Sequence, residues 1–167
     1  MKRVLAAATF CVLAACGSGA PAVNNPGATD NDVFTLSTPE LTLGPGEEKT
    51  FCYYTKMKNV QPFGVKRFES TMASGSHHLI LFTLKQETRP EGTLEECGFP
   101  RSGGFGGSRV IPVWTYAAQS PDASIEMPEG VGMTIEAEQH VVIQMHYLNQ
   151  HANISLFQSV VLNRGFY

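Results

Sequence analysis

From residue 33 onward, the sequence is a series of short apolar or alternating runs separated by glycine, proline and asparagine. These runs are rich in β-branched and aromatic residues, which is typical of strands, and apolar residues at helical spacing are hard to find. The expected strands are 33–37, 41–43, 50–55, 64–68, 78–85, 110–116, 123–127, 133–137, 140–148 and 154–162. Many short strands with turn signals between them predict an all-β fold, an antiparallel jelly-roll β-sandwich.

The run 140–148 separates an apolar face from a polar one, because successive side chains of a strand point to opposite faces. The apolar face, which we expect to pack on the core, holds Val141, Ile143 and Met145. The other face, which we expect to line an open surface or cleft, holds His140, Gln144 and His146.

The first residues depart from this pattern. Lys2 and Arg3 precede a short apolar segment, and small residues lead up to Cys16. This order predicts a secretory signal peptide over residues 1–15. It resembles the cleavage box of bacterial lipoproteins, in which the cysteine is lipidated and becomes the new N-terminus. The alternative is an ordinary signal peptide that happens to contain a cysteine.

Residues 16–32 are therefore expected to be the lipidated Cys16 followed by a disordered tether, since glycine, serine, alanine, proline and asparagine dominate this stretch. Where Asp at the second mature position retains lipoproteins in the inner membrane, Gly17 favours the outer membrane of the bacterial cell envelope. No later segment approaches the roughly 18 apolar residues of a spanning helix, so the anchor would be the contact with the membrane. Residues 33–167 are then one domain, long enough to bury a core.

Charge excludes one class of partner. Loss of Lys2 and Arg3 with the signal peptide leaves 10 basic residues against 15 acidic ones, a net charge of −5. No basic run remains, so we expect no nucleic-acid partner.

Two of the four cysteines lie in the N-terminal segment and two lie in the expected domain. Cys11 leaves with the signal peptide and Cys16 would carry the lipid, which leaves Cys52 and Cys97 as a pair in an oxidising compartment. A disulfide between them is the favoured interpretation. Two thiolate metal ligands are the alternative, although neither cysteine lies in a Cys-x-x-Cys arrangement.

Three histidines carry the candidate chemistry. His77 and His78 open one apolar run, and His146 lies near the end of another, with no Asp or Glu inside either run. Three imidazoles without carboxylates predict an all-nitrogen metal site, which suits copper and zinc. Adjacent residues of a regular strand point to opposite faces, so His77 and His78 can share one ion only if the chain is distorted at the start of the strand. The loop 73–76 would permit this. His140 and His151 are expected to be exposed to solvent or to contact a metal ligand without binding the ion themselves.

The order of these residues resembles a known family. The pattern is Phe51-Cys52, Phe68-Glu69, His77-His78-Leu79-Ile80-Leu81-Phe82, Cys97, Trp114, Pro128-Glu129-Gly130-Val131-Gly132 and Gln144-Met145-His146-Tyr147. It is similar to the N-terminal half of the copper type II, ascorbate-dependent monooxygenases, which include the peptidylglycine α-hydroxylating and dopamine β-monooxygenases. The resemblance covers roughly residues 50–162.

The resemblance implies a jelly-roll domain in which His77, His78 and His146 bind the electron-transfer copper. It implies one copper ion, with ascorbate as a reductant. Cys52 and Cys97 match family cysteines that pair with each other. Gln144 matches a glutamine that has been proposed to help pass electrons between the copper sites.

The sequence departs from the family in one respect. A second family domain carries the oxygen-activating copper on a His-x-His pair and a methionine, and this sequence contains no His-x-His. Met127, Met133 and Met145 are most simply core residues. Hydroxylation by this chain alone is therefore not expected, and a partner chain or a homodimer would have to supply the second copper site.

Other functions remain open. A non-enzymatic surface lipoprotein that binds or passes on copper is one. A zinc hydrolase is another, in which Glu69 or Glu138 would have to approach the histidines to act as a base. A structural sandwich without a metal is the third.

Overall fold

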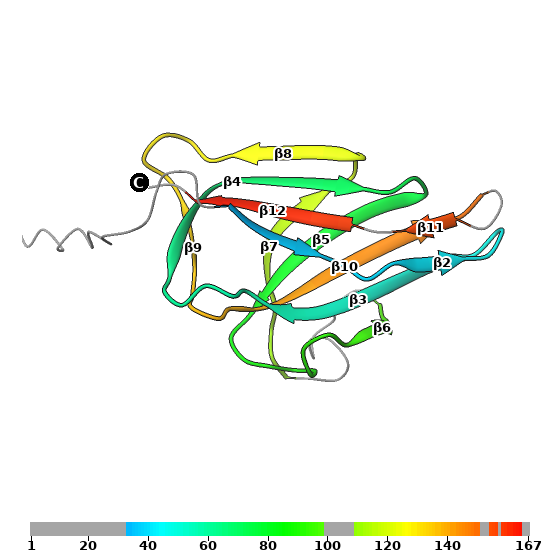
Figure 1. Ribbon diagram of the computed structural model, residues 1–167, viewed down its shortest axis with the longest axis horizontal. Helices are drawn as coiled ribbons and strands as arrows, with labels where there is room; N and C mark the ends of the chain where they lie inside the picture. Colours follow the sequence, from blue (N-terminus) through cyan, green and yellow to red (C-terminus); the bar gives the residue numbers. More distant parts are fainter. Residues whose placement is uncertain (1–32, 99–108, 151–153, 157, 165–167) are drawn as a thin grey trace, which may run out of the picture.

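The computed structural model describes residues 33–98, 109–150, 154–156 and 158–164, and these residues form an all-β structure (Figure 1). Their strands make two five-stranded antiparallel sheets and one two-stranded sheet, without a helix among them. No helix that could span a membrane occurs in this part of the chain. The expected signal peptide, Cys16 and the tether lie outside the described residues.

The first sheet contains the strands nearest the two ends of the domain. In spatial order it consists of β1 (Val33–Ser37), β12 (Gln158–Arg164), β4 (Phe63–Met72) and β8 (Asp122–Glu126), with β9 (Met133–Ile135) also paired to β4. A small ribbon of β2 (Leu41–Leu43) and β11 (Ile154–Leu156) extends from it.

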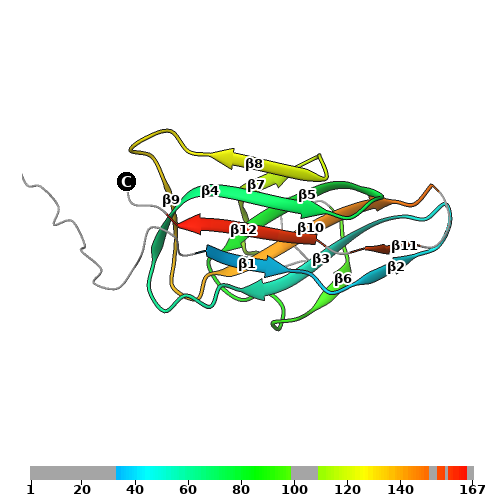
Figure 2. The same cartoon turned by 45° about the horizontal axis from the view of Figure 1, so that its top comes forward.

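The second sheet carries the histidines. In spatial order it consists of β6 (Leu94–Glu96), β3 (Glu48–Lys56), β10 (His140–Leu148), β5 (Ser76–Leu84) and β7 (Val113–Ala118). Figure 2 shows β8, β4, β12 and β1 side by side in front of this sheet.

The two sheets pack face to face through one hydrophobic core. Its buried residues include Phe68 on β4, Leu81 on β5 and Ile143 on β10. Phe68 stacks on Tyr116 of β7 with ring centroids 5.3 Å apart, which joins the two layers directly. Burying such side chains is the main favourable term in folding, and it fixes which face of each strand points inward. The molecule is therefore a two-layer antiparallel sandwich.

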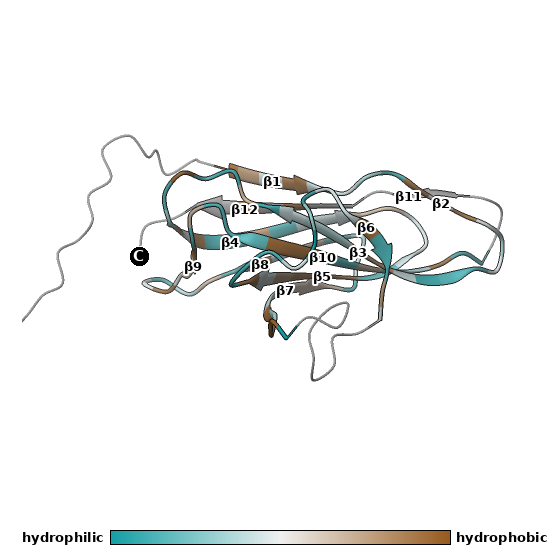
Figure 3. Cartoon of the chain, turned by 90° about the horizontal axis from the view of Figure 1, so that it is seen from below, coloured by the Kyte–Doolittle hydropathy of each residue, from teal (hydrophilic) through white to brown (hydrophobic). Residues whose placement is uncertain are grey.

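The outer face of the second sheet is also apolar along much of its length. A smaller buried cluster lies there, and it consists of Cys52, Tyr54, Ile80, Phe82, Leu84 and Val142. Figure 3 shows the apolar run of β5 in brown, since residues 79–82 are apolar on both faces. A strand that is apolar on both faces is typical of burial on both sides.

A disulfide crosses this outer face. Cys52 on β3 is bonded to Cys97, just after β6, with the two Cα atoms 5.8 Å apart. The next residue, Gly98, accepts a hydrogen bond of 3.0 Å from Nε2 of Gln144 on β10. The disulfide thus holds residues 97–98 against the outer face of the sheet.

The predicted all-β antiparallel fold is confirmed, while the jelly-roll connectivity stays a prediction. The bounds of 33–37, 41–43 and 140–148 are reproduced, and β6 was missed because its sequence, one leucine followed by two glutamates, has no strand pattern. The expected strand 154–162 is instead β11 and β12. Met145 is buried in the core, and Met127 and Met133 pack against this core, as expected.

Removing the disulfide should lower the free energy of unfolding by about 4 kcal/mol, because the closed loop of 45 residues restricts the unfolded chain. Urea unfolding of the oxidised protein and of a Cys52→Ala/Cys97→Ala double variant measures this difference. Reduction of the unmutated protein is the control and should shift its midpoint in the same direction. Equal midpoints in all three samples would contradict a stabilising cross-link.

Candidate metal centre

The three histidines lie on two neighbouring strands of the second sheet. His77 and His78 are near the start of β5, and His146 is near the end of β10. Because the two strands run antiparallel, these ends meet, and His146 lies directly opposite His78 in the register. The β-sheet pairing therefore brings together residues that are far apart in sequence.

A β-bulge places the adjacent pair on one side of the sheet. His146 pairs with His78, but Tyr147 pairs with Ser76, so His77 is an extra residue on β5 at this point. Such a bulge re-aims a side chain that would otherwise point to the opposite face. The chain enters β5 through a turn in which Gly75 has a φ of 87°, a conformation that glycine adopts without strain. The expected distortion is thus present.

The three imidazoles surround a common point. The ring centroid of His146 lies 5.0 Å from those of His77 and His78, and the latter two are 5.6 Å apart. One ring nitrogen from each residue lies within 4.8 Å of the others, and the Nδ1 atoms of His77 and His146 are 3.1 Å apart. A metal held at about 2.0–2.1 Å by three imidazoles spaces their nitrogens by about 3.3–3.6 Å. Small side-chain rotations would reach that spacing.

The three rings differ in their environment. His77 is exposed, whereas His78 and His146 are partly buried. Burial lowers the pKa of the His78 imidazole, and the rings of His146 and His77 lower it further. Nε2 of His78 is buried and has no hydrogen-bond partner among the described residues. A neutral imidazole with an unpaired buried nitrogen fits a metal ligand, since a metal binds the neutral form of the ring.

A carboxylate contacts the His146 ring on the side that faces away from His77. Oε1 of Glu48, at the start of β3, lies 2.9 Å from Nε2 of His146. When the imidazole is neutral, its Nε2–H donates to this carboxylate, which leaves the Nδ1 lone pair directed at His77 and available to a metal. Carboxylate, imidazole and metal in this order form a common arrangement that orients the ligand and raises its basicity.

Glu48 could not be identified from the sequence, because only the register of β3 against β10 shows that it can reach His146. The sequence offers Glu69 and Glu138 as candidate bases, and the structure places both elsewhere. Glu69 contacts Arg67 on the first sheet, and Glu138 pairs with Lys56.

Gln144 lies on the same face of β10 as His146, two residues away, but that face is not open as expected. Only 1% of Gln144 is exposed, because residues 97–98 cover it. Its Nε2 donates to the Gly98 carbonyl, and its Oε1 has no partner within the described chain. The role of Gln144 in electron transfer stays a prediction.

His140 is not part of the cluster. His140 lies at the opposite end of β10, opposite Lys56 and Leu84, and lines a separate hollow with Thr83 and Glu138. His151 lies outside the described residues. The structure thus groups His77, His78 and His146 and excludes His140.

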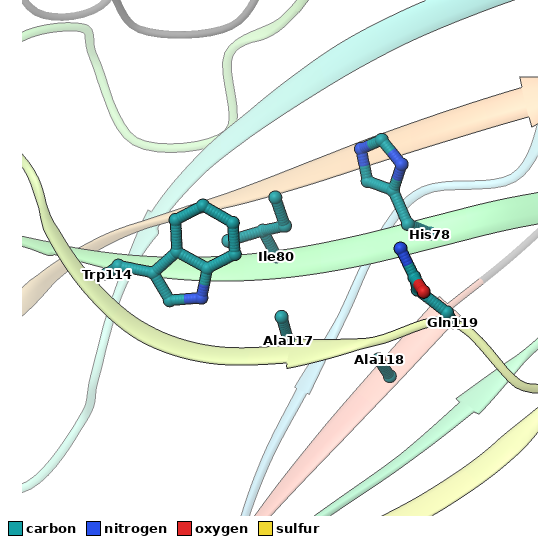
Figure 4. A pocket seen from close by; sticks show the side chains of 6 residues that line it. All are labelled: His78, Ile80, Trp114, Ala117, Ala118 and Gln119. Atoms are coloured by element: carbon teal, nitrogen blue, oxygen red, sulfur yellow. The ribbon is translucent and has the colours of Figure 1, made fainter.

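A groove of about 500 Å³ adjoins the cluster on the outer face of β5 and β7 (Figure 4). His78 and Gln119 lie at one end, and Trp114 lies at the other. Ile80, Ala117 and Ala118 line the part between them. The imidazole of His78 therefore belongs both to the histidine cluster and to the wall of this groove.

Comparison with known proteins does not assign the chain to a family. The sequence matches no protein-family model, and a search of curated proteins returned no match.

Replacing Glu48 with Gln should weaken metal binding by roughly 10-fold to 100-fold, because the imidazole of His146 loses a charged partner that orients it. Competition titration with a chelator of known affinity measures the change. The control is Glu87→Gln, which removes an exposed carboxylate just beyond the far end of β5. Equal affinities in the unmutated protein and Glu48→Gln would show that Glu48 has no part in the site.

Proposed function

We propose that this domain is a copper-binding redox module that resembles the electron-transfer half of the ascorbate-dependent monooxygenases. One observation carries the proposal: the bulge in β5 lets His77, His78 and His146 converge. The order of residues along the chain, from Cys52 to Tyr147, supports the same family.

The donor set favours copper. The cluster consists of three imidazoles, and neither a carboxylate nor a thiolate belongs to it within the described chain. Cys52 and Cys97 are bonded to each other and are therefore not thiolate ligands. Imidazole nitrogens bind copper and zinc, and copper(II) binds such sites most tightly among the common divalent ions. When bound there, copper would supply one-electron redox chemistry.

The protein's own groups would hold the ligands in a fixed arrangement. The β5–β10 pairing positions His78 and His146 opposite each other, the bulge turns His77 toward them, and Glu48 fixes the ring of His146. His77 is exposed, so a small reductant such as ascorbate, or a protein partner, could reach the site from solvent.

This arrangement favours electron transfer over hydrolysis. A zinc hydrolase needs a base beside the metal-bound water. Glu48 contacts Nε2 of His146, the ring nitrogen on the far side from His77, and therefore serves to orient the ring. In a hydroxylating assembly, a partner chain or a second copy would supply the oxygen-activating copper, because the sequence contains no His-x-His pair.

The alternative is a non-enzymatic surface lipoprotein that binds copper and passes it on. The exposure of His77 favours it, since a ligand at the surface allows another protein to take the metal. The expected anchor at Cys16 would hold either kind of protein to the bacterial cell envelope, by our inference its outer membrane. A copper site that ascorbate does not reduce would favour this alternative.

The purified protein should retain one copper per chain after loading and desalting, whereas His78→Ala and His146→Ala should retain none or bind at least tenfold more weakly. Losing one of three ligands leaves a two-coordinate site, which explains the expected loss. Elemental analysis measures the stoichiometry. The matched control is His140→Ala, which removes an imidazole from the far end of the same strand and should retain the full amount.

Two results would decide against the proposal. Full copper retention in His78→Ala and His146→Ala would show that the ion binds elsewhere. A preference for zinc, with bound copper(II) whose electron paramagnetic resonance signal persists after ascorbate is added, would rule out a redox role.

A further inference from the structure

The groove on the outer face of β5 and β7 has the volume and lining of a small-molecule site. Its volume of about 500 Å³ lies within the range of sites for small ligands. Its floor includes Ile80, which is 4% exposed, and the small side chain of Ala117, whereas the side chain of Ala118 packs in the core on the other face. The absence of bulk at Ala117 leaves this space open above the two strands.

One end of the groove is aromatic and flat. Trp114 is 53% exposed and packs edge-on against Phe82, with ring centroids 5.7 Å apart. The contact supports one part of the indole, while the exposed part faces the groove (Figure 4). Exposed tryptophans with a supported ring are common anchors for planar ligands, because they offer a large contact area at low entropic cost.

The other end of the groove is polar but not charged. Gln119 lies there beside His78, and its amide offers both a hydrogen-bond donor and an acceptor. Neither Lys, Arg, Asp nor Glu lines the groove within the described chain. An anion or cation would therefore lose hydration without gaining a partner of opposite charge.

We propose that this groove binds a neutral phenol-type ligand, with its ring against Trp114 and its hydroxyl group at Gln119, beside His78. The site goes beyond copper binding, because Trp114, Ile80, Ala117 and Gln119 take no part in the histidine cluster. A ligand in it would lie next to a proposed copper ligand, and only this last consequence rests on the proposed function.

The chain contains a single tryptophan, so the fluorescence of Trp114 reports directly on the groove. Titration of the metal-free, full-length protein with p-cresol should change this fluorescence saturably, with a Kd on the order of 1 mM for so small a ligand. Toluene should bind about fivefold more weakly, since it lacks the hydroxyl group. The anion 4-methylbenzoate should produce no saturable change.

Two variants locate the ligand. Ala117→Leu fills the groove beside Trp114 without removing the fluorophore and should weaken p-cresol binding at least tenfold. Its matched control, Ala137→Leu, alters an exposed alanine that does not line the groove but lies in the hollow beside His140, and should leave binding unchanged. In Gln119→Leu, p-cresol and toluene should bind with equal affinity.

Three outcomes would overturn the inference. Quenching that rises linearly with p-cresol and is identical in Ala117→Leu would show collision with an exposed indole. Equal affinity for p-cresol and toluene in the unmutated protein would remove the role of Gln119, and saturable binding of 4-methylbenzoate would contradict the neutral lining. Each result is independent of copper, so failure here leaves the proposed function standing, and loss of copper binding leaves this test valid.

Discussion

The candidate site depends on the β-bulge at the start of β5. In a regular antiparallel pair, His78 would face His146 and His77 would point into the opposite layer of the sandwich. The extra residue changes this, since two residues of β5 oppose one of β10 and both imidazoles lie on the outer face. The hydrophobic core keeps the bulge in place, because Leu79 and Tyr147 next to it are fully buried and fix the register on either side.

The outer face of the second sheet carries both a disulfide-linked apolar cluster and the three histidines. A disulfide and a small apolar cluster cover its middle, which buries Gln144 and leaves the histidines at one end partly exposed. The same register brings Glu48 on β3 to the far side of His146. The carboxylate on one side of the ring and the two imidazoles on the other favour one orientation of the ring. Such preorganisation lowers the cost of assembling a metal site.

Much of the fold and part of the site could be predicted from the sequence. Alternation in 140–148 identified the inner face, where Val141, Ile143 and Met145 are buried, and the adjacent histidines indicated a distortion before β5. Glu48 and the cover over Gln144 could not be predicted, because both depend on which strands are neighbours and on their register. Strand pairing is a long-range property that the pattern of one strand does not contain. The short β6, on which the position of residues 97–98 depends, left no pattern either.

Nuclear magnetic resonance of the histidine rings can show whether His77, His78 and His146 act together as one set of metal ligands. Copper(I) is diamagnetic, so the ring signals of all five histidines can be followed during a titration. We expect the signals of these three residues to shift together and to stop shifting at one equivalent, while the signals of His140 stay unchanged. A titration in which His77 does not shift with the other two, or in which His140 shifts instead, would contradict this expectation.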